Sequence, residues 1–296
     1  MACCPDRGGR RNLGPCSFLQ RPFLQPTGPL ARGPWRWPAA TSSSGFFALA
    51  CAFSWWAWIW YRFDPVGADA PILACGPFFA ALVMLAVVGG RPAVRAWFGK
   101  MVHWRVHPVW YAFVLLVPPA VSFGAVAIQT ATGVAPLPAR VVPGVGAVAA
   151  QFAFVLVYIG LGEEPAWRGY VLPRLAAGRS LLAAALVLGV LHIGWHLPLF
   201  GVEYHLGGNL LPWALAVIAT SVVVAWVWVH TGGSLLLPML LHGSVNTVNF
   251  VWRWYTGPDL VRLYWIWAGL WVGLAVLVVA LSGPRLTRQE VTGSLT

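Results

Sequence analysis

Two adjacent carboxylates, Glu163 and Glu164, stand in the string LGEEPAWRGYVLPRL, which follows an apolar run that begins near Gly144. An ionised carboxylate at membrane depth is costly unless it is paired or hydrated, so such residues are functional candidates by default. Arg168 lies one helical turn after Glu164 and is its expected ion-pair partner, whereas Glu163 has no equally placed partner of its own. The two carboxylates therefore indicate a membrane enzyme and not a membrane spacer.

Two pairs of polar residues at helical spacing follow the carboxylates along the chain. His192 and His196 are four residues apart in LGVLHIGWHLPLF, and His242 and Asn246 are four residues apart in LLHGSVN. Residues at this spacing share one face of a helix. A lone histidine on an apolar helix is most often a hydrogen-bonded core residue, but two polar pairs together with two carboxylates indicate a reactive cluster.

A metal centre is one chemistry that this cluster could support. Two histidines four residues apart and a carboxylate are ligands that zinc accepts, with the carboxylate as the third ligand or as a base. The HEXXH string of helical zinc peptidases is absent, however, because the residues between the two histidines are Ile193, Gly194 and Trp195.

Metal-free hydrolysis is the alternative chemistry. In this mechanism Glu163 acts as the general base on a water molecule, and His196 shares and orients the proton. His242 and Asn246 then donate hydrogen bonds to the oxyanion of a tetrahedral intermediate. Asn246 favours this alternative, because a neutral amide is a poor zinc ligand and a good oxyanion donor. We therefore expect no metal and no cofactor, and we expect the catalytic residues to be Glu163, Glu164, Arg168, His196, His242 and Asn246.

The composition indicates which elements must position these residues. Of the 296 residues, 59% are hydrophobic and only 9% are charged, and the mean hydropathy is +0.72, as is typical of a polytopic helical membrane protein. Stretches long enough to cross a bilayer lie at about 45–62, 71–90, 108–132, 144–163, 181–200, 210–231, 233–252 and 262–282. We therefore predict an all-α bundle of about eight transmembrane helices over residues 44–283.

A turn near Gly178 joins the helix of the carboxylates to the helix of the histidine pair. Glu164 lies about fifteen residues before this turn and His196 about eighteen after it, so both lie roughly 20–27 Å along an antiparallel pair of helices. The two side chains can therefore face each other. Pro165 lacks a backbone donor and crowds the carbonyl four residues earlier, so we expect the carboxylate helix to bend or restart there.

The net charge of +11 is explained by membrane topology. The arginines are scattered between apolar runs instead of forming one patch with interleaved aromatic residues, so we expect the bilayer and not a nucleic acid as the partner. With the N-terminus in the cytoplasm, fourteen of the 19 Lys and Arg fall on the cytoplasmic side, as the positive-inside rule favours. We therefore expect a basic, disordered arm over residues 1–43 and a short tail over 284–296, both in the cytoplasm; the Arg-rich, acid-poor composition of residues 1–43 is also that of an organelle transit sequence, and this alternative stays open.

The strings EEPAWRG, WHLPLF and HGSVN, in this order at the fourth, fifth and seventh predicted spans, resemble the CAAX-protease and bacteriocin-processing family. Its type II CAAX prenyl endopeptidases carry the motifs E-E-x-x-x-R, aromatic-x-x-x-His and His-x-x-x-Asn. The matching residues are Glu163, Glu164 and Arg168, then His196, then His242 and Asn246, within a catalytic core at about 140–255. His192 departs from the pattern, because it stands where the second motif generally begins with Phe or Trp.

This resemblance implies an eight-helix membrane bundle, in a prokaryotic plasma membrane, that cleaves membrane-associated proteins or peptides with a glutamate-activated water. Other functions on the same core remain open. They are a non-proteolytic scaffold or bacteriocin-immunity protein, and a zinc-dependent variant that uses His192. An ion-coupled transporter is a further alternative, but the internal repeats expected of one are not seen in the sequence.

Overall fold

The computed structural model describes residues 39–63, 74–133, 135, 143–200, 209–248 and 254–287, with the backbone alone for residues 39–43 and 62. Residues 1–38 of the predicted arm and 288–296 of the predicted tail lie outside the described residues. The first helix begins at Ala39, so its first turn lies inside the segment predicted to be disordered.

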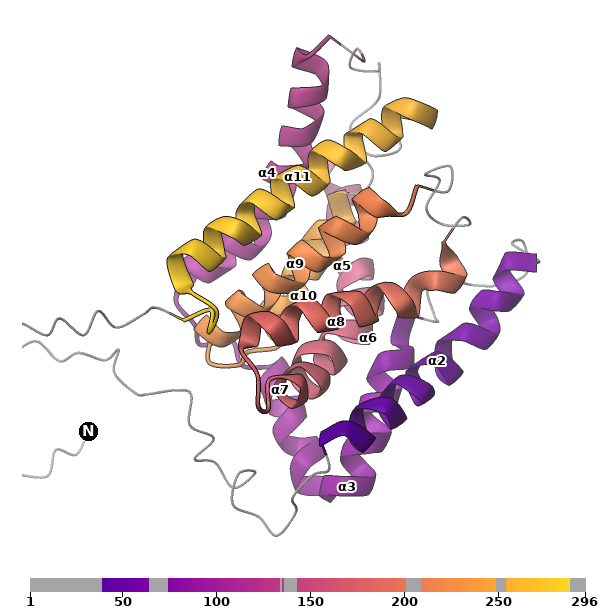
Figure 1. Cartoon of the computed structure of the whole chain (residues 1–296), viewed down its shortest axis with the longest axis vertical. Helices are drawn as coiled ribbons and strands as arrows, with labels where there is room; N and C mark the ends of the chain where they lie inside the picture. The colour runs from indigo at the N-terminus through magenta and orange to yellow at the C-terminus, as the bar shows by residue number, and fades with distance from the viewer. Residues whose placement is uncertain are drawn as a thin grey trace, which may run out of the picture. The chain divides into compact units, whose positions relative to one another are not determined.

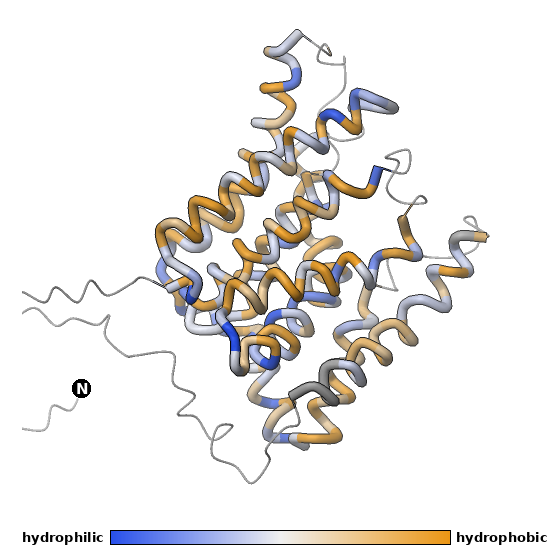
Figure 2. The backbone as a smooth tube through the Cα atoms, viewed as in Figure 1, coloured by the Kyte–Doolittle hydropathy of each residue, from blue (hydrophilic) through white to orange (hydrophobic). Residues whose placement is uncertain are grey.

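The described residues form helices and connecting turns, with no strand among them (Figure 1). The helices in chain order are α2 (Ala39–Phe63), α3 (Gly76–Met101), α4 (Pro108–Ala131), α5 (Val145–Val155), η2 (Leu156–Gly160), α6 (Leu161–Ala166), η3 (Trp167–Val171), α7 (Leu172–Leu175), α8 (Leu181–His196), η4 (Leu197–Leu199), α9 (Leu211–His230), α10 (Leu236–Thr247) and α11 (Gly257–Ser282). Apolar residues dominate most of their length (Figure 2).

Six of these helical runs are long and apolar enough to cross a membrane, within the part of the chain that the structure describes. They are α3, α4, the continuous run Val145–Leu175, the run Leu181–Leu199, α9 and α11. The first predicted span corresponds to the 25-residue α2, and the seventh to α10, whose 12 residues extend about 18 Å and fall short of a bilayer core of about 30 Å. The predicted polytopic all-α membrane fold is confirmed, and in the described part of the chain six helical runs are both long and apolar enough to span, where eight spans were predicted.

The helix α3 has two parts that meet at Gly90. The backbone of Gly90 is not helical (φ 62°, ψ −164°), and Pro92 follows at the start of the second part. This break coincides with the end of the predicted span 71–90. The second part carries three of the basic residues, Arg91, Arg95 and Lys100, and buries Trp97.

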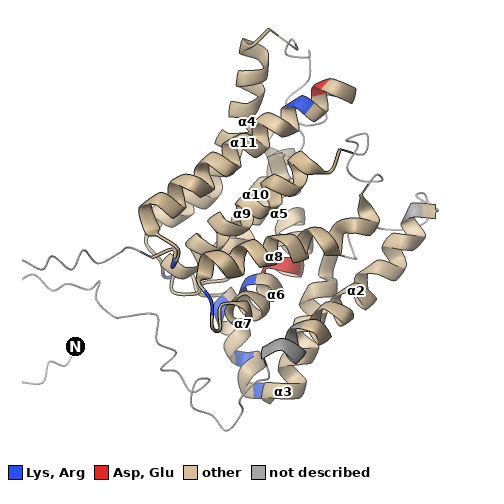
Figure 3. Ribbon diagram, in the orientation of Figure 1, with Lys and Arg blue, Asp and Glu red and all other residues tan. Residues whose placement is uncertain are grey.

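Arg168 lies in the interior and Arg262 lies near the start of α11 at one end of the helices, whereas most of the described Lys and Arg residues lie at the other end (Figure 3). Two chain connections meet there, because Nζ of Lys100 donates a hydrogen bond to the carbonyl of Gly232 at 3.1 Å and the amide of Leu235 donates to the carbonyl of Lys100 at 2.9 Å. The amide of Leu182 likewise donates to the carbonyl of Pro284 at 3.1 Å, which joins the start of α8 to the end of α11. We call this the basic end.

The carboxylate-bearing helix α6 lies in direct backbone contact with its neighbours. A Cβ atom on Gly160 would lie 2.9 Å from the carbonyl oxygen of Met239 in α10, and one on Gly162 would lie 3.0 Å from the carbonyl oxygen of Ala74. Both distances are shorter than ordinary van der Waals contact, and rigid backbone occupies the space. The two glycines therefore allow α10 and the segment before α3 to fix the position of α6.

Gly160→Ala tests this close contact. The added methyl group must push the backbone of α10 away, so we expect the free energy of unfolding to fall by about 1–3 kcal/mol. Gly146→Ala in α5 is the matched control, because nothing lies within 4 Å of its Cβ position. Thermal unfolding of the purified protein in detergent measures both changes, and equal melting temperatures for the two variants would contradict the close packing.

Candidate active site

The carboxylate helix continues through Pro165. Two π-helical turns flank α6, with η2 before it and η3 after it. A π turn contains one residue more than an α turn and relaxes the local hydrogen-bond ladder, here on each side of the α-helical turn that holds Pro165. The carbonyl of Pro165 also accepts a hydrogen bond from Nε1 of Trp97 at 2.9 Å. Of the two predicted alternatives at Pro165, a bend or a restart, the restart is wrong, because the helical run continues through the proline between two π turns.

Glu164 is held by partners on two helices. Its Oε1 atom accepts hydrogen bonds from Nη1 of Arg168 at 2.8 Å and from Nδ1 of His242 at 2.7 Å. The side chains of Glu164 and Arg168 are 1% and 3% exposed, so the ion pair lies away from water, where an unpaired charge is costly. The predicted ion pair is confirmed, and the bond from His242 joins α6 to α10.

Glu163 has a separate set of partners. Its Oε2 atom accepts hydrogen bonds from Nε2 of His192 at 3.0 Å and from Nε1 of Trp167 at 3.3 Å. Trp167 stands four residues after Glu163 and is a neutral donor, so among the described residues Glu163 has no Lys or Arg partner at helical spacing, as expected. Within the described part of the chain no hydrogen bond reaches Oε1 of Glu163, which leaves this oxygen for a water or a substrate.

His196 lies one turn beyond His192 on α8. Its Nδ1 atom donates a hydrogen bond to the carbonyl of His192 at 3.1 Å, and the two imidazole centroids are 4.7 Å apart. The rings of Trp195 and Trp213 pack around it, with centroids at 4.6 and 5.6 Å. Sequence reasoning placed His196 beside Glu163 and treated His192 as a departure from the pattern. In the structure His192 makes the direct contact with Glu163, and its position four residues before His196 was the signal for it.

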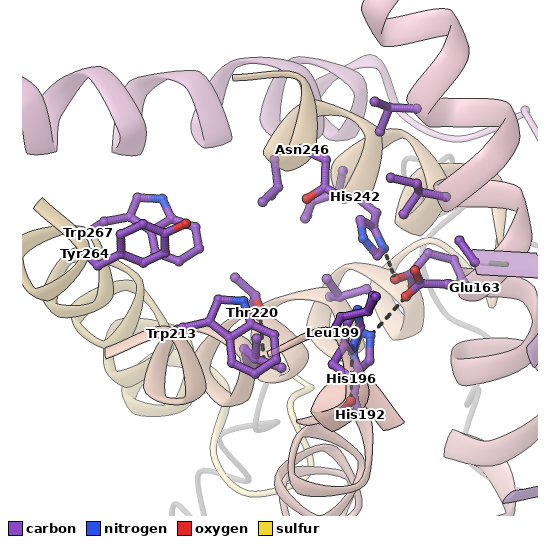
Figure 4. Close-up of a pocket in the computed structure, with 18 of the residues that line it drawn as sticks. Glu163, His192, His196, Leu199, Trp213, Thr220, His242, Asn246, Tyr264 and Trp267 are labelled. Atoms are coloured by element: carbon purple, nitrogen blue, oxygen red, sulfur yellow. Dashed lines mark hydrogen bonds and ion pairs between the residues drawn. The ribbon is translucent and has the colours of Figure 1, made fainter. Parts of the chain in front are cut away.

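All six predicted catalytic residues line one cavity of about 760 Å³, together with His192. In Figure 4 the two histidines of α8 lie on one side of the carboxylates, and His242 and Asn246 of α10 lie on the other. The predicted gathering of Glu163, Glu164, Arg168, His196, His242 and Asn246 at one place is thus confirmed. Their individual catalytic roles stay predictions.

Aromatic side chains line the cavity beyond the histidines. Tyr264 and Trp267 of α11 lie away from Glu163, and Trp213 of α9 lies between them and His196 (Figure 4); all three are at most 5% exposed. The sequence did not predict these aromatic residues as part of the site. A spacing of three residues between Tyr264 and Trp267 puts both on one helix face, but nothing in the sequence says that this face looks into the cavity.

The charge in the cavity is confined to its carboxylate end. Among the described lining residues the charged ones are Glu163, Glu164 and Arg168, and Arg168 is engaged with Glu164. Glu163 is thus the carboxylate whose charge faces the cavity without a cation of its own in contact. A carboxylate held by hydrogen bonds in a site shielded from bulk water can accept a proton or bind a cation.

Arg168→Ala tests the ion pair as the support of the site. The change leaves Glu164 buried without its cation, and breaking such a pair typically costs about 3–5 kcal/mol. We expect lower yield of folded protein and a lower melting temperature. Arg262→Ala is the control, because its pair with Asp259 is 41% and 44% exposed and is worth only about 0–1 kcal/mol. If the two variants insert and melt alike, Arg168 is not the structural partner of Glu164.

A family model described as type II CAAX prenyl endopeptidase Rce1-like matches residues 145–248. The matched residues are less than half of the chain, and they run from the start of α5 to the end of α10. They contain all three motifs and the residues of the ion pair. No curated protein matches the chain in sequence. The match confirms the resemblance predicted from the motifs: through residues 145–248 the chain is similar to the Rce1-like type II CAAX prenyl endopeptidases, a family of peptidases.

Proposed function

We propose that this integral membrane protein is an intramembrane endopeptidase that cleaves membrane-associated proteins or peptides with a water activated by Glu163. The observation that carries the proposal is the Glu163 carboxylate, which is 2% exposed, is hydrogen-bonded to His192 and lines a large cavity among apolar helices. The family match supports peptide hydrolysis, and the apolar helices around the site support a substrate that reaches it within the bilayer.

Glu163 is the general base of the proposed reaction. Its Oε1 atom takes a proton from the water while the water oxygen attacks the carbonyl carbon of the peptide bond. The same proton then passes to the peptide nitrogen as the C–N bond breaks, which releases an amine and a carboxylic acid. His192 and Trp167 hold Oε2 in place, and His196 beside them orients the water.

His242 and Asn246 are the proposed donors to the oxyanion that forms on the carbonyl oxygen. They lie one turn apart on α10, on the side of the cavity opposite the histidines of α8 (Figure 4). Donation from Nε2 of His242 requires the doubly protonated ring, and Glu164 against Nδ1 is the counter-ion that this form needs. Glu164 and Arg168 therefore act by holding His242 and not by touching the substrate.

The proposed orientation puts both termini and the basic end in the cytoplasm, as the positive-inside rule favours. From Glu163 the cavity extends towards Leu199 at the end of η4, Trp213 at the start of α9 and Gly257 at the start of α11. These positions lie at the helix ends opposite the basic end. In this orientation the aromatic part of the cavity lies in the non-cytoplasmic half of the membrane.

Glu163→Gln and Asn246→Ala separate the base from the oxyanion donor. Gln keeps the shape and hydrogen-bonding capacity of Glu but cannot accept the proton, so we expect no turnover of a peptide substrate by Glu163→Gln. Asn246→Ala removes one donor, typically worth about 10²–10³ in kcat, and should leave measurable activity with little change in KM. Both variants should insert and melt like the parent. More residual activity in Glu163→Gln than in Asn246→Ala would refute these roles.

Single cysteines at Gly99 and Gly146 test the orientation. Both glycines are exposed and have open space at the Cβ position, and they lie near the basic end and the opposite end respectively. The five native cysteines are first replaced by serine. A membrane-impermeant maleimide should label Gly146→Cys in intact cells and Gly99→Cys only after permeabilisation. Labelling of both sites in intact cells would break the predicted span count, and labelling of Gly99→Cys alone would reverse the orientation.

A further inference from the structure

His192, His196 and Glu163 bring three metal-binding side chains to one wall of the cavity. One ligand atom of each lies within 4.8 Å of the corresponding atoms of the other two. Glu163 and His192 are buried and His196 is half-buried, so the cluster is shielded from bulk water. Two helices, α6 and α8, supply the three residues.

The spacing fits coordination of a single ion. Imidazole nitrogens and carboxylate oxygens bind zinc at about 2.0–2.2 Å, so two such donors in a tetrahedral set lie about 3.4 Å apart. Nε2 of His192 and Oε2 of Glu163 are 3.0 Å apart, joined by a proton. An ion can replace this proton if Nε2 of His192 and Oε2 of Glu163 move apart by a few tenths of an ångström. The ring of His196 must move somewhat further towards these two atoms.

The surroundings already orient two of the three side chains, His196 and Glu163, as metal ligands are usually oriented. A metal-binding histidine generally donates its other ring N–H to a carbonyl or a carboxylate, which fixes the ring and its tautomer. Nδ1 of His196 donates to the carbonyl of His192 at 3.1 Å, so Nε2 is the nitrogen that would bind the ion. Nε1 of Trp167 donates to Oε2 of Glu163 at 3.3 Å and holds that carboxylate.

We propose that Glu163, His192 and His196 form a binding site for a divalent transition-metal ion of the zinc type, with the fourth coordination position facing the cavity. Two imidazoles and one carboxylate are a ligand set that such ions accept, and an open position is typical of sites that bind a water or a substrate. The charge of the cavity favours a cation, because the only guanidinium among the described lining residues is engaged with Glu164.

Occupation of this site and the metal-free reaction exclude each other. The carboxylate of Glu163 is a ligand in one state and the general base in the other. A bound ion therefore removes the base, and removal of the ion by a chelator such as EDTA should maintain or raise the rate of peptide cleavage. The binding of the ion itself does not depend on whether the protein is a peptidase.

Titration of the purified full-length protein with Co²⁺ tests the site directly. We expect visible absorption of four- or five-coordinate cobalt at one equivalent, and its loss when Zn²⁺ displaces the cobalt. His192→Phe keeps an aromatic ring between Trp167 and Trp195, whose centroids lie 5.1 and 6.0 Å away, but removes a ligand. Loss of a supporting contact costs about 10–100-fold in metal affinity, so loss of a ligand should cost at least about 100-fold. Glu163→Gln is the second variant and should weaken binding likewise.

His230→Phe is the matched control. Nδ1 of His230 also donates to the carbonyl four residues earlier, that of Trp226, at 3.0 Å, and its ring also packs on tryptophans, but His230 does not line the cavity. The affinity of the His230→Phe variant for Co²⁺ should equal that of the parent protein. The proposal is overturned by absence of the visible bands, by bands with thiolate-to-cobalt charge transfer, or by equal affinity in the parent, His192→Phe and Glu163→Gln.

A cleavage assay run in parallel separates this proposal from the proposed function. Cobalt binding without any cleavage supports the metal site and overturns the peptidase. Cleavage without cobalt binding supports the peptidase and overturns the metal site. If EDTA abolishes cleavage and Zn²⁺ restores it, the metal site stands and the exclusion of metal from the reaction is overturned.

Discussion

The ion pair between Glu164 and Arg168, with His242 as its third member, is the interaction on which the arrangement of the site depends. A carboxylate and a guanidinium that are 1% and 3% exposed are tolerated among apolar helices only because each neutralises the other. The hydrogen bond from His242 connects this ion pair to a second helix, and it thereby orients α10 relative to α6. Asn246 lies one turn after His242 on α10 and also lines the cavity. The hydrogen bond between His242 and Glu164 therefore helps to fix the position of Asn246 in the cavity.

Adjacent positions on a helix point about 100° apart, and this difference separates the two carboxylates by function. Glu164 turns towards α10 and is bound by two cationic or polar partners, whereas Glu163 turns towards α8 and keeps one oxygen for the cavity. The pair therefore combines a charge that holds the helices with a charge that can react. The structural function explains only Glu164, and the reactive function explains only Glu163. Both are needed to explain why two carboxylates stand side by side in the membrane.

Local spacing made much of the site predictable from the sequence. The contacts that follow from the periodicity of one helix, such as Glu164 with Arg168, could be predicted, and so could the grouping of the three motifs from α6, α8 and α10. The bond between Glu163 and His192 was not, because it depends on the rotation of α8 about its axis. The path of the chain through Pro165 was missed because local rules assume an α-helix, and the backbone contact of Gly160 with α10 depends on packing between distant segments.

The two π turns around α6 let the chain carry a surplus residue without changing the direction of the motif. In a regular α-helix one added residue rotates everything beyond it by about 100° about the helix axis, whereas a π turn takes up about one residue more per turn and absorbs that rotation. The direction in which Glu163 points relative to α5 therefore depends on η2 keeping its π geometry, although the residues of η2 carry no charge. A chain of the same length with a regular α turn at η2 would keep the string EEPAWRG intact and direct its first carboxylate away from the cavity.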